Sequence, residues 1–458
     1  MKIGFLPLYI ELYDRVGVSR RELEAFYETL ASAFESNGIE VIRTPLCRLT
    51  SEFAEAVHGY ESEKADAIVT WHAAYSPSLE SIDVLAATDL PIVVLDTTEA
   101  EDFSPAQHPD CVNTCHGIHG VMDMCNLLRR RGKTYAIAAG HYPTSDVLER
   151  VIGYLKAAVA ARSLAGSRVG TIGSSFPGMG DFLISDADIA ARFGVEVVHS
   201  DADELRALTA ELTEEEIASE MAADLDGATL LSVIPESTHR DTVKDSLAVR
   251  KWLANNDIAA FTANFLDIDP SQGLTSMPFM EASKAMSRGI GYAGEGDILT
   301  AALVGALLKG FKETAFVEIF CPDWKNGTLF LSHMGEGNYA LFTEKPALKK
   351  LDFIYSEADD PIVGYGCYKA GDAVFVNLYA DENGYNLFLA PVTMETPTDT
   401  DNFTDRVRGW MRPTMPVAEF LEKLSTAGAT HHSALVYGAA VDQLAYFGRL
   451  LGLTVVTP

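Results

Sequence analysis

Short apolar runs and amphipathic stretches alternate along the first third of the chain. The apolar runs include many β-branched residues: IGFLPLYI, VIRTP, AIVTWH, IVVLD and YAIAAG. Stretches with a helical pattern lie between them, such as RRELEAFYETLASAFESNG and SLESIDVLAATD. This alternation predicts strands and helices that build a parallel α/β sheet. A helix is also expected at about 144–163, where Ser145 and Asp146 can cap its free amide groups.

The same alternation starts again at about residue 167 and stops at about residue 312. In this second α/β unit, SRVGTIGSS, VEVVHS, ATLLSVI and IAAFTANF are expected strands, and helices are expected at 200–227, in TVKDSLAVRKWLANND and at about 297–311. After 312, TAFVEIFC, GTLFLSHMG, LDFIYSE, DAVFVNLYA, GYNLFLAPV and HHSALVYG predict strands joined by polar turns, followed by one helix and a final strand. We therefore predict an N-terminal α/β domain (1–166), a central α/β domain (167–311) and a β-rich C-terminal domain (312–458).

Composition and charge restrict the partners of the chain. Of its 458 residues, 48% are hydrophobic and 22% charged, which is an ordinary globular composition. The net charge of −30 repels phosphate backbones and anionic membranes, so neither nucleic acid nor a membrane is an expected partner. Divalent cations and neutral polyols are compatible with such a surface, although the charge can also serve solubility alone.

The first residues and the small number of cysteines predict a cytoplasmic protein. The first residues, MKIGFLPLYI, have no small-residue cleavage site after them, so they predict a first strand and not a signal peptide. No apolar stretch reaches the roughly 18 residues that a membrane span needs. Six cysteines are few for this length, as expected in a reducing compartment.

Acidic and imidazole side chains gather near the start of the β-rich part. The segments are GEGD (Glu295, Asp297), FVEIF (Glu318), SHMGEGN (His333, Glu336) and THHSA (His431, His432). Glu318 lies in an apolar run, where a carboxylate is costly to bury unless it is paired or bound to a metal. Two carboxylates and an imidazole suit a divalent ion such as Mn²⁺. Taken singly, each Glu can also be a surface residue and each His a structural one.

Three other motifs are less specific. CVNTCHGIHGVMDMC contains cysteines and histidines, but its spacing differs from that of structural zinc sites, so a helix start with packed cysteines is the simpler interpretation. GSSFPGMGDF has neither the G-x-G-x-x-G order nor a P-loop Lys, so it is a weak nucleotide motif. WHAAYSPS follows an expected strand, and its aromatic residues can contact a ligand or pack in the core.

Considered together, these segments resemble L-arabinose isomerase and, more loosely, L-fucose isomerase. WHAAYSPS, TCHGIHG, IAAGHY, AFTANFLD, GYAGEGDILTAAL, FVEIF, SHMGEGN and ATHHSALVYG follow the order of that family through most of the chain. The resemblance implies two Rossmann-like α/β domains followed by a C-terminal β-barrel-like domain. It also implies a cytoplasmic, metal-dependent aldose–ketose isomerase that acts on a pentose or a deoxyhexose-type sugar through a cis-enediol intermediate.

The resemblance also implies roles for individual residues. Glu318, Glu336 and His432 would hold Mn²⁺, or another divalent cation such as Co²⁺ or Mg²⁺, and the two glutamates would also be the acid–base pair. His431 and His333 would support these ligands. The implied assembly is a homotrimer or homohexamer in which His116 reaches a neighbouring site. The other residues expected to contact the sugar are Tyr75, Met179, Phe265 and Tyr355.

Two departures from the family pattern affect the expected substrate and metal site. Tyr355 stands where arabinose isomerases have a further metal-binding His, and Ile10 or Glu11 stands near a sugar-contacting Gln. We therefore expect a substrate other than L-arabinose alone. Two alternatives stay open at this point: a non-catalytic cytoplasmic sugar-binding paralogue, and an epimerase on the same scaffold.

Overall fold

A computed structural model describes residues 1–16, 20–398 and 400–458 of the chain. The chain forms two compact units, Met1–Val159 (unit 1) and Ala160–Pro458 (unit 2). Unit 2 contains all of the predicted central and C-terminal domains, and the division of the chain into three domains stays a prediction. In the described ranges, no helix has the length and apolar character that a membrane crossing requires.

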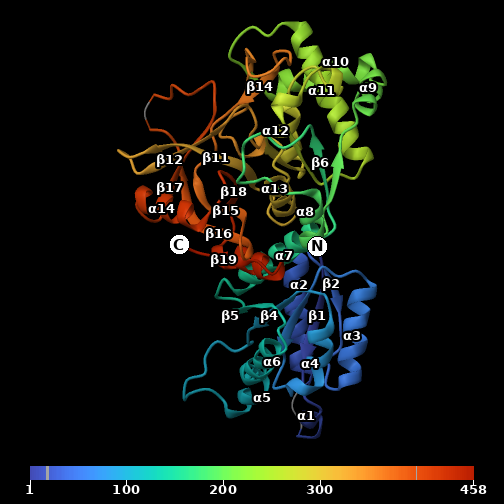
Figure 1. The fold of residues 1–458 in the computed structure, drawn as a ribbon. Coiled ribbons are helices and arrows are strands. Elements are labelled where there is room, and N and C mark those ends of the chain that lie inside the picture. The colour runs from blue at the N-terminus through green and yellow to red at the C-terminus, as the bar shows by residue number, and fades with distance from the viewer. Residues whose placement is uncertain (17–19, 399) are drawn as a thin grey trace. The chain divides into compact units, whose positions relative to one another are not determined.

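Unit 1 contains a five-stranded sheet in the order β2-β1-β3-β4-β5, and every neighbouring pair is parallel (Figure 1). This confirms the α/β prediction for the first part of the chain. The strands are β1 (Lys2–Leu8), β2 (Glu40–Arg43), β3 (Ala67–His72), β4 (Ile92–Asp96) and β5 (Tyr135–Ala139). The helices are α1 (Glu11–Val16), α2 (Arg20–Ser36), α3 (Thr50–Ser62), α4 (Ser78–Ala87), α5 (Val112–Cys115), α6 (Ile118–Arg130) and α7 (Val147–Leu164), whose last residues belong to unit 2.

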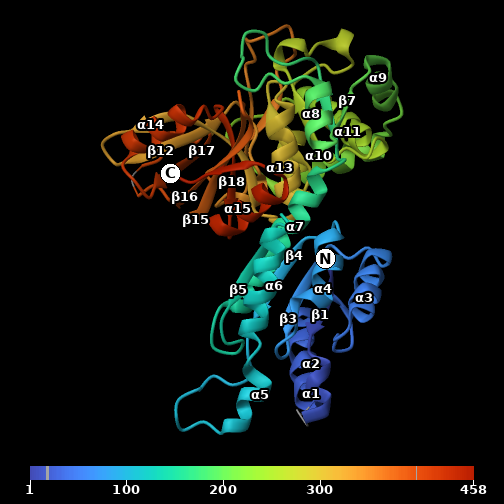
Figure 2. The ribbon, with the colours of Figure 1, turned by 60° about the horizontal axis from the view of Figure 1, so that its bottom comes forward.

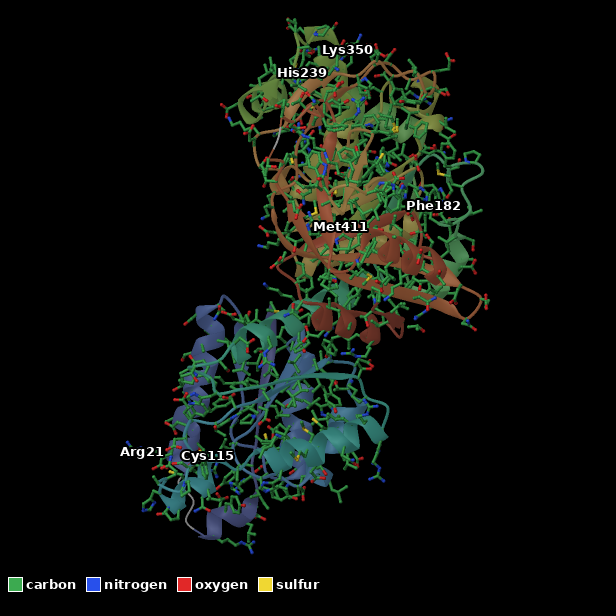
Figure 3. The ribbon with its side chains drawn as sticks, turned by 90° about the vertical axis from the view of Figure 1, so that its left-hand side faces the viewer. Arg21, Cys115, Phe182, His239, Lys350 and Met411 are labelled. Carbon is green, nitrogen blue, oxygen red and sulfur yellow. The ribbon has the colours of Figure 1, made fainter. Side chains whose placement is uncertain are left out.

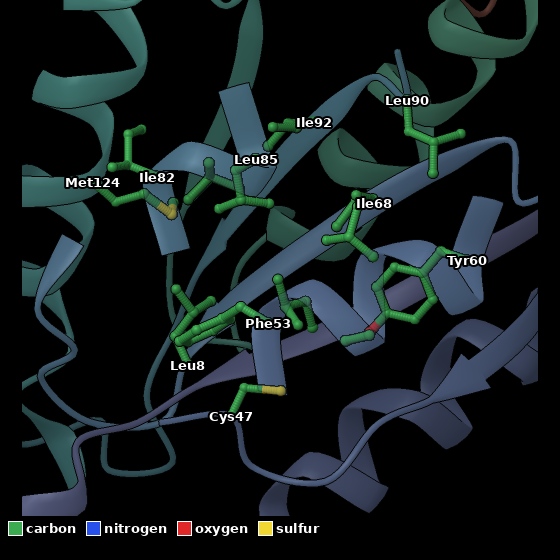
Figure 4. Packing of buried hydrophobic residues seen from close by; sticks show 14 of the residues in the cluster. Leu8, Cys47, Phe53, Tyr60, Ile68, Ile82, Leu85, Leu90, Ile92 and Met124 are labelled. Atoms are coloured by element: carbon green, nitrogen blue, oxygen red, sulfur yellow. The ribbon is translucent and has the colours of Figure 1, made fainter. Parts of the chain in front are cut away.

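Apolar side chains fill the space between this sheet and α3, α4 and α6. Phe53 of α3, Leu85 of α4 and Met124 of α6 belong to one buried cluster with Ile68 and Ile92 of the sheet (Figure 4). Strands of a parallel sheet with both faces covered are expected to be apolar almost throughout, and this is the composition of β1, β3 and β4.

The strand order of unit 1 reverses between β1 and β3, which makes a switch point at the carboxyl ends of these strands. From β1 the chain crosses to β2 on one side and then returns to β3 on the other side, so the connections after β1 and β3 diverge. In open α/β sheets, ligands bind outside the carboxyl ends of the strands at such a point. Tyr9 follows β1, and His72 ends β3, so the loops at this position carry the aromatic and imidazole side chains described below.

Unit 2 contains a second parallel sheet, in the order β10-β9-β6-β7. Its strands are β6 (Arg168–Ile172), β7 (Glu196–His199), β9 (Ala260–Ala263) and β10 (Gly291–Gly294). The helices of this region are α8 (Asp186–Phe193), α9 (Ala202–Ala210), α10 (Glu214–Gly227), α11 (Glu236–Asn255), α12 (Phe279–Ser287) and α13 (Ile298–Gly310).

A closed six-stranded barrel follows, and it confirms the predicted β-rich C-terminal part. The order β15-β18-β11-β12-β17-β16 closes through pairing of β16 with β15, and β19 adds to β16. The strands are β11 (Thr314–Asp323), β12 (Thr328–His333), β15 (Gly371–Asp381), β16 (Gly384–Glu395), β17 (Val407–Pro413), β18 (His432–Tyr437) and β19 (Thr454–Val456). Two helices complete this region, α14 (Val417–Ala427) and α15 (Val441–Leu450).

The predictions for two segments, ATLLSVI and LDFIYSE, were wrong. Only Thr229–Leu230 of ATLLSVI is a strand (β8), and it pairs with β13 (Ala347–Lys350) in a small sheet with β14 (Ile362–Tyr365), not with the central sheet. Its residues are exposed, so their apolar character does not reflect a buried strand. LDFIYSE forms a loop: Phe353 is buried and its amide donates to Asp360, but Ile354 is 82% exposed.

Helix α13 lies between the parallel sheet and the barrel within unit 2 (Figures 1 and 2). It contacts β6, β9 and β10 on the sheet and β11, β15 and β18 on the barrel. Every residue from Ile298 to Leu308 is buried, as expected for a helix that is apolar on all sides. The helix also meets β10 closely, because a Cβ on Gly291 would lie 2.3 Å from the amide nitrogen of Gly305.

A network of ion pairs joins α10, α11 and α12. Arg250 of α11 binds Glu220 of α10 at 2.7 Å and the fully buried Glu281 of α12 at 2.8 Å. Lys284 of α12 reaches back to Glu220 and Asp224. His239 of α11, labelled in Figure 3, forms a hydrogen bond with Asp224 of α10. The three helices are therefore held together by charges that are largely removed from water.

Replacing Glu220 with Gln is expected to lower the free energy of unfolding by about 2 kcal/mol at neutral pH. Burial alone would raise the pKa of Glu220, but Arg250 and Lys284 lower it from 4.5 to about 2. A lowered folded-state pKa stabilises the fold above about pH 4.5, and this contribution disappears as the pH falls towards 2. Urea unfolding at several pH values should show a wild-type advantage that shrinks in acid. The same substitution at the exposed Glu215 of α10 is the control, and an advantage independent of pH would contradict the assignment.

Candidate functional site

Three barrel strands bring Glu318, His333 and His432 together. Glu318 of β11 stands directly opposite His432, the first residue of β18, so both side chains lie on the same face. His333 ends β12, and its Nε2 lies 3.7 Å from Oε2 of Glu318. The ring of Phe316 contacts both imidazoles, with centroid distances of 4.9 Å to His333 and 5.0 Å to His432. Phe316 thus limits the rotation of both rings.

The turn between β10 and α13 adds a second carboxylate and a buried cap. Glu295 has a positive φ of 64°, a conformation that costs a residue other than glycine about 1–3 kcal/mol. Its Oε2 lies 3.5 Å from Nε2 of His432 and 3.8 Å from Nε2 of His431. Asp297 is fully buried: one oxygen accepts from the amide of Thr300, and the other lies 3.0 Å from Nδ1 of His432.

These donors fit a divalent cation. Two groups of possible ligand atoms occur in the described part of the chain: Glu318 with His333 and His432, and Glu295 with His431 and His432. Within each group, the candidate ligand atoms lie within 4.8 Å of one another. His432 is fully buried, and its Nε2 has no hydrogen-bond partner among the described residues. A buried imidazole nitrogen without a partner, next to two carboxylates, is the arrangement that a metal ion would complete.

Glu336 lies on the other side of His333. Its Oε2 is 2.7 Å from Nδ1 of His333 and accepts the amide hydrogen of Gly335, and its Oε1 accepts from the hydroxyl of Tyr292 at 2.9 Å. Glu336 is 1% exposed and Tyr292 is fully buried. The sequence-predicted ligands Glu318 and His432 are therefore neighbours in the structure, whereas Glu336 contacts the cluster through His333.

Burial and neighbouring charges separate the pKa values of the acidic groups. Burial raises the pKa of Glu318 above its usual value, although His333 and His432 oppose this shift. Burial acts in the same direction on Glu336, but His333 and the hydrogen bonds to its carboxylate outweigh it and lower that pKa. The pKa of Glu295 is also lowered, because the nearby imidazoles outweigh its burial. In carboxylate clusters, such opposite shifts mark different roles in proton transfer.

The pKa values of two imidazoles are raised. Burial would lower the pKa of His333, but the charges of Glu336 and Glu318 raise it to about 9. His431 is half-buried, and its carboxylate partners Glu295 and Asp181 likewise raise its pKa to about 9 against the effect of burial. His431 Nδ1 lies 2.6 Å from Asp181 in the loop between β6 and α8. The structure thus places His431 and His333 beside the proposed ligands.

Aromatic residues lie together elsewhere in unit 2. The ring of Phe265 contacts Phe176 at 5.4 Å and Tyr355 at 6.1 Å, and Tyr355 is 53% exposed. Met179 belongs to the same loop as Phe176, whose carbonyl accepts its amide hydrogen at 3.3 Å. Phe182 of this loop, labelled in Figure 3, stacks on His432 with centroids 5.1 Å apart. Phe265 and Tyr355 therefore belong to one cluster of aromatic residues. The loop 173–185 connects this cluster with His432, because Phe176 contacts Phe265 and Phe182 contacts His432.

Unit 1 has its own cluster at the carboxyl ends of β1 and β3. Nε2 of His116 hydrogen-bonds with the hydroxyl of Tyr13, and Tyr75 stacks on His119 at 4.7 Å. The two histidine rings lie 5.1 Å apart. The predicted sugar-contacting residues Tyr75 and His116 thus lie in one aromatic and imidazole cluster within unit 1.

The sequence alone did not single out Asp181, Tyr13 or Tyr292. Asp181 follows a glycine-rich turn, a weak signal for a residue at a ligand-facing loop. Tyr292 occurs in a short strand that the apolar pattern did not indicate. The role of its hydroxyl cannot be predicted from the sequence, because it depends on the contact with Glu336 in the folded chain.

The sequence of this chain is similar to those of known proteins. The sequence pattern of the L-arabinose isomerase central domain matches residues 185–310, and that of the L-arabinose isomerase C-terminal domain matches residues 313–454. L-arabinose isomerase 2 of Bacillus licheniformis is 25% identical, covering 89% of this chain and 87% of the relative. L-arabinose isomerases of Lactiplantibacillus plantarum (23% identical; 86% and 84% covered) and Bacillus subtilis (25% identical; 86% and 80% covered) are also similar.

These matches identify the chain, with its two parallel α/β sheets and closed barrel, as an enzyme of the aldose–ketose isomerase class. The two domain patterns together cover more than half of the chain. The chain belongs to the L-arabinose isomerase family, which confirms the resemblance found in the sequence.

Replacing Gly294 with Ala is expected to disturb the site directly. The added Cβ would lie 2.8 Å from Cε1 of His333, whose ring Glu336 and Phe316 hold in place. We expect a loss of about 1–3 kcal/mol in the free energy of unfolding, measured with urea, and a strong loss of ketose formation. Gly59 of α3 has no atom near an added Cβ, so Gly59→Ala is the matched control. Full activity in Gly294→Ala would contradict the described packing.

Proposed function

We propose that this chain is a divalent-metal-dependent aldose–ketose isomerase that acts on a pentose or a deoxyhexose-type sugar other than L-arabinose alone. The observation that carries this proposal is the fully buried Nε2 of His432, which has no hydrogen-bond partner among the described residues and lies beside the carboxylates of Glu318 and Glu295. We propose Mn²⁺ as the cation, because a mixed set of carboxylate and imidazole donors suits such an ion. Glu318 and His432 are the proposed ligands that this geometry supports most directly, and Glu336 completes the set proposed from sequence.

Isomerisation moves one proton between two neighbouring carbons. A base removes the proton from C2 of the aldose, a cis-enediol forms, and the proton returns to C1 while the hydroxyl proton passes from O2 to O1. When bound, the cation would polarise the substrate oxygens and stabilise their developing negative charge. We assign the proton transfers to Glu318 and Glu336. His333 lies between the two carboxylates, so their titrations are coupled, and in this proposal they act as one acid–base pair.

The sugar-contacting part of the site is proposed to come from two sources. Phe265 and Tyr355, together with Met179, offer apolar and hydroxyl surface in unit 2. Tyr75 and His116 lie at the strand ends of unit 1, where ligands of open α/β sheets bind. We propose that the protein is a homotrimer or homohexamer in which His116 reaches the site of a neighbouring copy. All six cysteines are free, which supports the cytoplasm as its compartment.

Proton NMR in D₂O should reveal the reaction and its metal requirement. Aldopentoses, 6-deoxyaldohexoses and tetroses are incubated with the protein, first with Mn²⁺ and then with EDTA. We expect one sugar to be converted into its ketose only when Mn²⁺ is present, with or without deuterium at the exchanging carbon. A 2-epimer in place of a ketose would identify an epimerase. Conversion that continues in EDTA would exclude the proposed metal dependence.

Replacing Glu318 with Gln should abolish most of the turnover. The amide has nearly the same shape but cannot accept a proton, so we expect kcat to fall by about 10²–10⁴-fold while the fold is kept. Glu344→Gln, at an exposed position after the Glu336 loop, is the control. Ketose formation at near wild-type rates by Glu318→Gln would refute the proposed acid–base role.

A further inference from the structure

The ring of His432 is held at one nitrogen and covered on one face. Its Nδ1 lies 3.0 Å from the fully buried carboxylate of Asp297. The ring of Phe182, labelled in Figure 3, lies nearly parallel to the imidazole, with an interplanar angle of 8° and centroids 5.1 Å apart. Phe182 is itself buried, so the two rings stack away from water.

These two contacts restrict different motions of the imidazole. A hydrogen bond at Nδ1 selects the nitrogen that faces Asp297, but the ring can still turn about the line that joins the two groups. The side-chain torsion that sets the plane of an imidazole has broad minima and does not fix this angle by itself. A flat aromatic ring stacked on one face does fix it. Because the lone pair of Nε2 lies in the ring plane, that plane decides the direction in which this nitrogen can bind a ligand.

We infer that Phe182 is a positioning residue for the proposed metal ligand His432, and that contacts at both ends of the loop 173–185 keep Phe182 on this ring. The inference rests on the proposed metal dependence and leaves the proposed ligands Glu318, Glu336 and His432 unchanged. The side chain of Phe182 has no atom that could bind a cation, so it acts through the plane of the imidazole.

The first residues of the loop are attached to two neighbouring segments. The amide and the hydroxyl of Ser174 both donate to Asp267, at 2.8 and 2.7 Å, and the amide of Phe176 donates to the carbonyl of Glu295 at 2.9 Å. Gly296 permits this close approach, because a Cβ there would collide with the carbonyl oxygen of Ser174. The loop therefore begins directly on the turn between β10 and α13.

The end of the loop is attached to the residue before β18. Oδ2 of Asp181 accepts from the amide of His431 at 2.9 Å and lies 2.6 Å from Nδ1 of the same residue. Asp181 precedes Phe182, and His431 precedes His432, so these contacts bring the two stacked rings together. Ser185 then caps α8. Phe182 is thus held between an attachment to the barrel and the start of a helix.

Phe182→Leu removes the flat face and keeps an apolar side chain. Phe193→Leu is the matched control, because Phe193 of α8 is also buried, and its ring contacts Tyr385 and not the donor groups. A second pair of variants tests the attachment of the loop. Asp181→Ala removes its contacts with His431, and Asp186→Ala removes a similar contact with the exposed His199, at 2.7 Å in the same unit.

Mn²⁺ binding to the full-length protein tests the inference without relying on turnover. Isothermal titration calorimetry gives the affinity, and electron spin-echo envelope modulation of bound Mn²⁺ detects directly coordinated imidazole nitrogens. His432→Gln identifies the signal of that imidazole. We expect Phe182→Leu to keep this signal, because His432 is still present, but to bind Mn²⁺ at least about tenfold more weakly, as expected when a residue that orients a ligand is removed. Phe193→Leu should match the wild type in both measurements.

The outcomes separate this inference from the proposed function. A wild-type protein that binds no Mn²⁺, or a His432→Gln variant that binds it as the wild type does, would overturn the proposed metal site, and the inference with it. If both of these proteins behave as proposed, wild-type affinity in Phe182→Leu would overturn the inference alone. Equal weakening in Phe182→Leu and Phe193→Leu would do the same, since it would show a general effect of lost packing.

Asp181→Ala decides the matter if Phe182→Leu does not fold. Weaker Mn²⁺ binding in Asp181→Ala than in Asp186→Ala would support the positioning role of the loop. The same affinity in these two variants would contradict it.

Discussion

The buried carboxylate of Asp297 connects the parts of unit 2 on which the site depends. One of its oxygens caps the first turn of α13, and the other holds Nδ1 of His432 on barrel strand β18. A buried carboxylate costs several kcal/mol unless it is paired, and here the helix N-terminus and the imidazole both compensate it. Because α13 also packs against the parallel sheet, this one side chain fixes a barrel residue relative to the sheet.

Two further residues of this region, Glu295 and Glu318, lower the stability of the fold, and a function explains why they are kept. Glu295 adopts a left-handed backbone conformation, and Glu318 is a carboxylate in an otherwise apolar strand segment. Each is unfavourable for the fold alone, but together they direct two carboxylates towards His432. Strain and buried charge concentrated at one place are typical of sites organised before the ligand binds. Nε2 of His432, which has no hydrogen-bond partner in the described part of the chain, is the position at which a cation would offset these costs.

The sequence predicted the fold class and part of the site, and the failures have physical causes. Parallel strands buried on both faces give continuous apolar runs, so β1, β3 and β4 were visible. Strand β17 (VRGWMRP) was missed because its buried positions include Gly and Pro and its outward positions include Trp, so the apolar–polar alternation is unclear. LDFIYSE was mistaken for a strand although Phe353 is its one buried residue. Glu318 was conspicuous in its apolar run. Tyr292 and Asp181 became visible only through contacts 44 and 250 residues away.

The possible metal donors have a restricted distribution in the chain. Among the described residues, the two donor groups belong to unit 2, and the two family patterns match residues of this same unit. Tyr355, which departs from the family pattern, packs against Phe265 and not within either donor group. A substitution at position 355 can therefore leave both donor groups unchanged.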